Sequence, residues 1–205
     1  MRSRGVTFVP LEVTTDDASL IDGVYDYAVT DRYIYVLPVK EPRIVLFDRQ
    51  GRFIRTLVKE GQGPGEFRGI LPCIQVDERN DRLFLFSNNR VWEYTLEGEF
   101  IGQSTHEYSV IYMRHIGKDR FAAISFPFQP FNGGGFGLGL FSRKGDTIAI
   151  KNDFYSFLLP HEKSGFTTSI APAYSDAQNS VLFKTGSNDT VFCISADRIS
   201  AACVL

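Results

Sequence analysis

The stretch Phe47-Asp48-Arg49-Gln50-Gly51-Arg52-Phe53-Ile54 decides the fold, because the chain repeats its pattern twice. The pattern returns as Tyr94-Thr95-Leu96-Glu97-Gly98-Glu99-Phe100-Ile101, and then as Phe141-Ser142-Arg143-Lys144-Gly145-Asp146-Thr147-Ile148. The glycines of successive copies are 47 residues apart, and each lies in a polar turn between two apolar runs. A hairpin that recurs at such a period is typical of repeat architectures, and one blade of a β-propeller has about this length.

The apolar runs around these turns are short and fall into four groups, each with the pattern of a four-stranded antiparallel meander. We expect the corresponding blades at approximately residues 24–58, 71–103, 110–151 and 167–205. No segment keeps a helical period over three turns, so we expect very low helix content. The sequence therefore predicts an all-β propeller in a single domain spanning residues 1–205.

Residues 6–14 are expected to form one further strand. In a propeller, an N-terminal strand of this kind completes the last blade, closes the ring and removes an exposed sheet edge. Four blades and this strand fill the chain, which stops within the apolar run Ala201-Ala202-Cys203-Val204-Leu205. We therefore expect the 205 residues to be part of a larger ring, and an open ring of four blades would expose apolar faces and self-associate.

Composition excludes several classes of partner. The formal net charge is -2 with 22% charged residues, which gives no basic footprint for nucleic acid. No apolar stretch reaches the roughly 18 residues of a transmembrane helix, and the basic N-terminus lacks the apolar region of a signal peptide. Cys73, Cys193 and Cys203 form neither a disulfide framework nor a C-x-x-C pair, so we expect them to be small buried apolar side chains.

A second motif, Gly61-Gln62-Gly63-Pro64-Gly65-Glu66-Phe67, follows the first hairpin directly. Leu71-Pro72 and two apolar runs come next, the second leading through Asn89-Arg90-Val91-Trp92-Glu93-Tyr94 to Gly98-Glu99-Phe100. This order resembles the NHL repeat and, more closely, the six-bladed β-propeller family sometimes called TolB-like, which is abundant in Bacteroidetes. Val9-Pro10-Leu11-Glu12 and Gly186-Ser187-Asn188-Asp189-Thr190-Val191-Phe192 also resemble phrases of that family, so the resemblance covers roughly residues 6–205.

The resemblance implies a six-bladed ring and a place in the cell envelope of a bacterium, in the periplasm or at the cell surface. The sequence departs from the family pattern in three ways: an insertion in the third blade, the absence of two further blades, and the lack of an export signal. The resemblance implies little about activity, because propellers host many functions.

The glycines between Gly61 and Gly65 could be taken for a phosphate-binding loop. Such a loop ends in Gly-Lys-Ser/Thr and opens a helix, whereas Pro64 and Glu66 occupy that region here and no helical pattern follows. We interpret the segment as a tight crossover between blades, in which Glu66 accepts hydrogen bonds from the backbone or from an arginine.

The remaining chemical motifs are absent from the sequence. His106, His115 and His161 have no metal-ligand spacing, and we expect each at the surface or half buried. No Asp-x-Asp calcium loop and no Gly-x-Ser-x-Gly elbow occurs. The sequence therefore predicts no catalytic constellation, no metal site and no cofactor.

Loop lengths indicate where binding would occur. In a meander blade, the loop between the second and third strands and the crossover to the next blade lie on one face. These connections are long here, at residues 38–42, 59–70, 87–90 and 152–167, whereas the turns on the opposite face are short. Long loops on one side of a rigid scaffold are the usual place for a binding site.

The candidate ligand-binding residues are Glu66 and Arg68 on the first crossover, Asn88 and Arg90 on the adjacent loop, and Phe128 and Phe131 on the insertion at residues 126–136. The insertion carries four phenylalanines among prolines and glycines. These rings could form a platform for a sugar ring or a peptide, or they could cover the core of their own blade.

The leading functional interpretation is a non-enzymatic module that binds a protein or glycan ligand through its loop-rich face. The alternative is an enzyme that resembles the propeller lyases and lactonases, which hold calcium in the central channel. Such a site needs several Asp, Asn or Glu side chains from the inner strands, and these strands offer few carboxylates. A third interpretation is a fragment without a function of its own.

Overall fold

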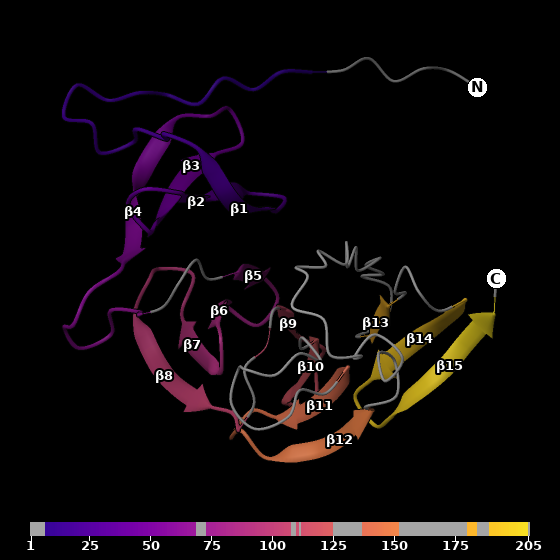
Figure 1. Cartoon of the computed structure of the whole chain (residues 1–205). Helices are drawn as coiled ribbons and strands as arrows, with labels where there is room; N and C mark the ends of the chain where they lie inside the picture. Colours follow the sequence, from indigo (N-terminus) through magenta and orange to yellow (C-terminus); the bar gives the residue numbers. More distant parts are fainter. Residues whose placement is uncertain are drawn as a thin grey trace, which may run out of the picture. The chain divides into compact units, whose positions relative to one another are not determined.

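Strands make up the regular structure of the described chain. The computed structural model describes residues 7–68, 73–107, 110, 112–124, 137–151, 180–183 and 189–204. These residues form four antiparallel sheets, and in each sheet the strands follow one another in space as they do in sequence (Figure 1). No helix occurs among them, which confirms the all-β prediction.

The strands have the following bounds. The first sheet contains β1 (Val24–Val29), β2 (Tyr33–Pro38), β3 (Arg43–Asp48) and β4 (Phe53–Lys59). The second contains β5 (Cys73–Asp77), β6 (Arg82–Ser87), β7 (Arg90–Tyr94) and β8 (Phe100–Thr105). The third contains β9 (Tyr112–His115), β10 (Arg120–Ile124), β11 (Leu138–Ser142) and β12 (Thr147–Lys151). The fourth contains β13 (Ser180–Phe183), β14 (Thr190–Ser195) and β15 (Ile199–Val204), and the strand expected before β13 lies outside the described residues.

The chain divides into two compact units. One comprises Met1–Leu85 with Trp92–Gly102, and the other comprises Phe86–Val91 with Gln103–Leu205. The first unit contains the predicted first crossover at residues 59–70, and the second unit contains the β6–β7 turn.

The three repeated turns share one hydrogen-bond pattern. Asp48 Oδ1, Thr95 Oγ1 and Ser142 Oγ each accept a hydrogen bond from the backbone N–H four residues later, at 3.0 to 3.1 Å. The N–H of each repeated glycine donates to the carbonyl of the same Asp, Thr or Ser at 3.0 Å. The repeat therefore conserves a short side chain with an oxygen rather than one residue type, because any such side chain can stabilise this turn.

The repeated glycines also make one kind of packing contact. Gly51, Gly98 and Gly145 have φ angles of 85°, 87° and 102°, in the region that side chains disfavour. A Cβ atom added to each would lie 2.0, 2.8 and 2.3 Å from the carbonyl oxygens of Pro10, Leu57 and Thr105, respectively. These carbonyls are themselves 47 and 48 residues apart, so the contact repeats together with the turn. Leu57 and Thr105 belong to β4 and β8, the last strands of their sheets.

The expected strand at residues 6–14 is not a strand in the described part, residues 7–14. Pro10 has no N–H to donate to a ladder, and the segment instead follows the β3–β4 turn. The N–H of Glu12 donates to the Gly51 carbonyl at 2.8 Å, and the Glu12 carboxylate accepts the N–H of Phe53 at 2.8 Å. Leu11 packs beside the buried cluster of the first sheet that contains Phe47.

Each face of the first sheet contributes to a different apolar cluster. Tyr35 and Leu37 of β2 pack with residues of the second sheet, including Trp92. Val36, between them, packs on the other face with Phe47. Side chains alternate between the faces of a strand, so a run of buried residues such as that in β2 means that both faces are covered. In the second unit, the third and fourth sheets share a cluster in the same way.

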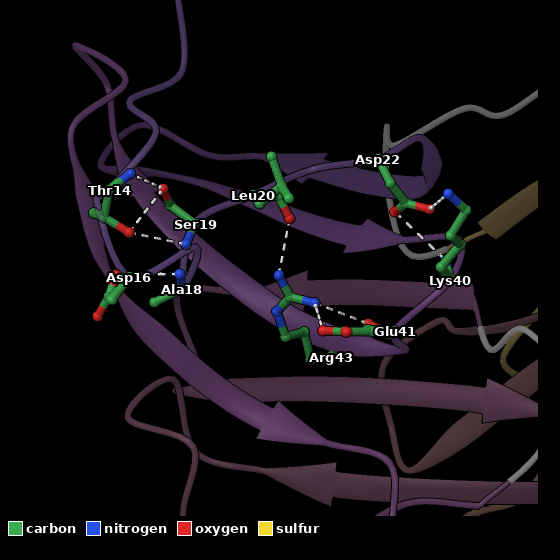
Figure 2. Close-up of polar contacts among 9 residues, drawn as sticks. All are labelled: Thr14, Asp16, Ala18, Ser19, Leu20, Asp22, Lys40, Glu41 and Arg43. Carbon is green, nitrogen blue, oxygen red and sulfur yellow. Dashed lines mark hydrogen bonds and ion pairs between the residues drawn. The ribbon is translucent and has the colours of Figure 1, made fainter.

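The segment that contains Leu20 and Asp22 lies against the loop between β2 and β3 (Figure 2). Arg43 donates to the Leu20 carbonyl at 2.8 Å and pairs with the Glu41 carboxylate at 2.8 Å. Asp22 accepts the N–H of Lys40 at 3.5 Å, and its second oxygen lies 3.9 Å from the Lys40 ammonium nitrogen. This loop, predicted as part of the binding face, is thus held by the N-terminal segment.

Candidate functional site

The crossover after β4 folds back on itself. Glu60 and Phe67 form a parallel bridge, and the N–H of Gly61 donates to the Phe67 carbonyl at 3.1 Å. Phe67 is fully buried and contacts Trp92 edge to face, with 6.4 Å between the ring centroids. One buried aromatic side chain therefore anchors a loop that otherwise consists of glycine and polar residues.

Glu66 stabilises the crossover from inside. Its carboxylate accepts the N–H of Gly63 at 2.8 Å and lies 3.7 Å from the Lys59 ammonium nitrogen. The Glu66 carboxylate also lies directly against Gly61, since a Cβ atom at Gly61 would lie 1.8 Å from Glu66 Oε2. The contacts agree with the interpretation of Glu66 as an acceptor of backbone hydrogen bonds within the crossover.

Arg68 lies at the exposed end of the same loop. Its Nε donates to the Gly61 carbonyl at 3.1 Å, so the base of the guanidinium is fixed to the loop. The structure thus brings Glu66 and Arg68 together, because both bind the backbone of the stretch Gly61–Gly63.

Below this loop, Tyr94 is fully buried, and its hydroxyl has no hydrogen-bond partner among the described residues. Burial raises the pKa of Tyr94 far above its usual range, and the charge of Glu66 raises it further. The group is therefore a neutral core phenol and provides no acid or base for the loop.

The β6–β7 turn presents the second candidate pair. Asn88 and Arg90 are both exposed, and Asn88 has a positive φ of 51°, a conformation that asparagine tolerates better than most residues. The carbonyl of Asn88 accepts the N–H of Val110 at 3.0 Å. The turn is therefore tied to the segment that follows β8. Asn88 and Arg90 lie in the second compact unit, whereas Glu66 and Arg68 lie in the first.

Asn89 and His106 form a connection that the sequence did not indicate. The N–H of His106 donates to the Asn89 carbonyl at 2.7 Å, and Asn89 Nδ2 donates to the His106 carbonyl at 3.2 Å. The expectation of a surface or half-buried His106 is wrong, since the residue is 2% exposed. No spacing or neighbouring motif indicated this burial, because it depends on contacts with β10 and β11 that are distant in sequence. His115 is half buried as expected, and His161 lies outside the described residues. The expectation of a buried Cys203 is wrong, since Cys203 is exposed, whereas Cys73 and Cys193 are half buried.

The two remaining candidates, Phe128 and Phe131, lie outside the described residues, as does the whole insertion at residues 126–136. Their role as an aromatic platform stays a prediction.

The turns at the opposite ends of the strands form ion pairs in the first unit. Arg32 of the β1–β2 turn lies 3.5 Å from Glu78 of the β5–β6 turn. Arg55 of β4 pairs with Glu97 of the β7–β8 turn. These charges are engaged with each other.

A central metal site would need carboxylates from the inner strands, which are the first strands of the sheets, β1, β5 and β9. Asp26 of β1 accepts the N–H of Ile74 at 2.8 Å and that of Tyr27 at 2.9 Å. Burial raises the pKa of Asp26, and these two hydrogen bonds oppose the rise. Across the residues that the structure describes, no three His, Cys, Asp or Glu side chains form a group that could hold a metal ion.

The chain is similar to a known protein family. A family model described as Domain of unknown function (DUF4934) matches residues 4–205. A search of curated proteins finds no match. No helix in the described segments is long and apolar enough to cross a membrane.

Three solved structures share the arrangement of strands. The chain superposes over 95% of its length on 54% of a Bacteroides fragilis protein described as a candidate exported protein, with a TM-score of 0.71 and 19% identity. It superposes over 89% on 57% of a duf4221 family member from Bacteroides vulgatus, with a TM-score of 0.59 and 11% identity. It superposes over 88% on 54% of a streptogramin B lyase, with a TM-score of 0.53 and 13% identity. The chain spans about half the length of these structures. The streptogramin B lyase is a propeller, and the likeness of the chain to these structures shows a propeller-like all-β fold.

Proposed function

Because the chain belongs to the DUF4934 family, whose model matches nearly all of it, we propose that it acts as a non-enzymatic binding module. The ligand binds through the loops at one end of the blades. The observation that carries this proposal is an exposed arginine, Arg68, on a loop whose conformation is fixed by its own side chains.

A fixed loop favours binding because little conformational entropy is lost when a ligand arrives. Glu66 orders the glycines of the crossover, and Phe67 anchors it in the core. In the β6–β7 turn, hydrogen bonds to the Asn88 and Asn89 carbonyls do the same for exposed Arg90. Both loops therefore offer a cation from an ordered backbone.

The exposed guanidinium groups favour a ligand that carries carboxylates, because planar guanidinium binds carboxylate in a bidentate manner. Acidic glycans and acidic protein segments share this chemistry. Phe128 and Phe131 would add a stacking surface for a sugar ring or an aromatic side chain.

The test is binding of acidic and neutral oligosaccharides and peptides on an array, followed by affinity measurement on the best binder. We expect Arg68→Ala and Arg90→Ala each to weaken binding about tenfold, as for loss of a charged hydrogen bond. Arg55→Ala is the matched control, because Arg55 of β4 pairs with Glu97 of the β7–β8 turn, away from the proposed binding loops. This variant should leave the affinity unchanged. Equal affinities in all three variants would overturn the proposal.

A propeller enzyme with a central metal is the alternative. Support for it comes from the likeness in fold to a streptogramin B lyase. Against it, Asp26 and Asp77, the carboxylates on the described inner strands β1, β5 and β9, are both engaged with backbone or side-chain donors. A rise in the melting temperature on addition of millimolar calcium would favour the enzyme, because a ligand of the native state alone stabilises it.

We further propose that the blades belong to a six-bladed ring in the bacterial envelope and that residues 7–14 take the place of the last strand of a blade. Support for this placement of residues 7–14, which do not form a strand themselves, comes from the spacing of Pro10, Leu57 and Thr105, whose carbonyl oxygens approach the three repeated glycines. Support for the envelope comes from the likeness to a protein described as a candidate exported protein. A crystal structure of the protein would reveal the number of blades in its ring directly.

A further inference from the structure

His106 is a buried histidine whose ring makes no hydrogen bond to the part of the chain that the structure describes. It directly follows β8 and is 2% exposed, and neither Nδ1 nor Nε2 has a hydrogen-bond partner among the described residues. The ring meets Phe121 and Phe141 edge to face, with centroid distances of 6.1 and 5.1 Å. A neutral imidazole tolerates this aromatic site, whereas an imidazolium brings a charge and a second N–H that need an acceptor or water.

No carboxylate of the described residues accepts a hydrogen bond from the His106 ring. The elements packed against it are β10, β11, the β6–β7 turn and the β11–β12 turn, whose Gly145 approaches the Thr105 carbonyl and the His106 nitrogen. The charged residues on these elements and beside His106 in sequence are Arg90, Glu107, Arg120, Arg143, Lys144 and Asp146. Burial alone lowers the pKa of His106, to about 4.

The backbone of His106 holds the β6–β7 turn. It exchanges two hydrogen bonds with Asn89, at 2.7 and 3.2 Å, and Val110 adds a third to the Asn88 carbonyl. A movement that takes the His106 ring into water would therefore strain or break the contacts that order this turn.

We propose that His106 is an acid-sensitive latch, in which protonation of the ring releases the turn that carries Asn88 and Arg90 from the segment following β8. The inference rests on the proposed function only for its consequence, since the released turn is one of the two proposed binding loops. The release itself concerns the protein and protons alone.

Amide hydrogen exchange, followed by NMR and corrected for the intrinsic effect of pH, tests the latch. The amides of His106 and Val110 report on the turn. If the open state titrates at the ordinary histidine pKa and the closed state at about 4, opening should increase roughly 50-fold between about pH 7 and pH 4.5. The amides of Tyr35 and Val45, in the other unit, serve as controls and should stay protected.

His106→Phe keeps an aromatic ring in the site and cannot be protonated. In this variant, we expect the exchange rates of the backbone amides at positions 106 and 110 to change less than about twofold over the same pH range. Equal acceleration in the wild type and in His106→Phe would overturn the latch, and so would an ordinary His106 titration with full protection of the turn. Loss of protection at Tyr35 as well would mean global unfolding and would also overturn it.

The readout needs no ligand, so failure to find a ligand leaves this result intact. Conversely, a ligand whose affinity depends on Arg68 and Arg90 but not on pH would uphold the proposed function and exclude the latch as its regulator.

Discussion

Replacing the repeated glycines by alanine should destabilise the protein strongly, whereas replacing a nearby strand glycine should not. Gly51, Gly98 and Gly145 have positive φ angles, and a Cβ atom would lie 2.0 to 2.8 Å from a backbone carbonyl oxygen. Gly102, in β8, has no heavy atom within 4 Å of the equivalent Cβ position and serves as the matched control.

The magnitude follows from two effects. A left-handed conformation costs an alanine about 1 kcal/mol, and the overlap with a carbonyl oxygen forces a backbone shift of the kind that costs about 1–3 kcal/mol. The lower entropy of the unfolded alanine chain offsets about 0.5 kcal/mol. We therefore expect each of the three variants to lose about 2–3 kcal/mol of unfolding free energy, and Gly102→Ala to be neutral or slightly more stable.

Urea unfolding, followed by the fluorescence of the buried Trp92 and by circular dichroism, measures these differences. With a slope of about 2 kcal/mol per molar urea, the three variants should unfold at roughly 1–1.5 M lower urea than the wild type. Because the chain has two compact units, the two probes are compared before a two-state analysis is applied. Three variants that unfold at the midpoint of Gly102→Ala would refute the reasoning.

Three further predictions concern ionisable side chains. The pKa of His106 is lowered to about 4, so the unfolded state takes up the proton first, and the unit that contains His106 should lose about 3 kcal/mol of unfolding free energy as pH drops from about 6.5 to 4. His106→Phe should remove this part of a pH-dependent denaturation series of that unit. Glu93 is buried and lies 2.7 Å from Arg82, whose side chain keeps part of its contact with water, so Glu93→Ala should cost about 2 kcal/mol in urea unfolding, against about 0.5 kcal/mol for the exposed Glu97→Ala. Glu66→Ala should cost about 1–2 kcal/mol and Glu66→Gln less, because Gln keeps an acceptor for the loop N–H; equal losses on thermal melting would contradict this role.

The fold could be predicted because its signal is local and repeated. The oxygen of Asp48, Thr95 or Ser142 and the glycine three residues later determine each turn within a few residues of sequence. Apolar runs such as that of β2 then indicate strands that are covered on both faces. These features need no knowledge of distant contacts.

The missed features depend on such contacts. The burial of His106 follows from Phe121 and Phe141, and no pattern around His106 itself predicts which strands will cover it. Residues 7–14 alternate enough to suggest a strand, yet Pro10 lacks a donor, and the segment packs on a turn instead. For the candidate site, glycine spacing predicted the crossover and the inward role of Glu66, whereas the bracing of the β2–β3 loop by Arg43 depends on a segment some twenty residues away.

The measurement that tests the central claim most directly is a hydrogen-exchange footprint of the best array binder on the intact chain. The account predicts added protection in the peptides that contain Gly61–Arg68 and Asn88–Arg90, and none in the turns at Asp48–Gly51 and Thr95–Gly98. Protection confined to those opposite turns, or to the inner strand that carries Asp26, would contradict binding through the loop-rich face.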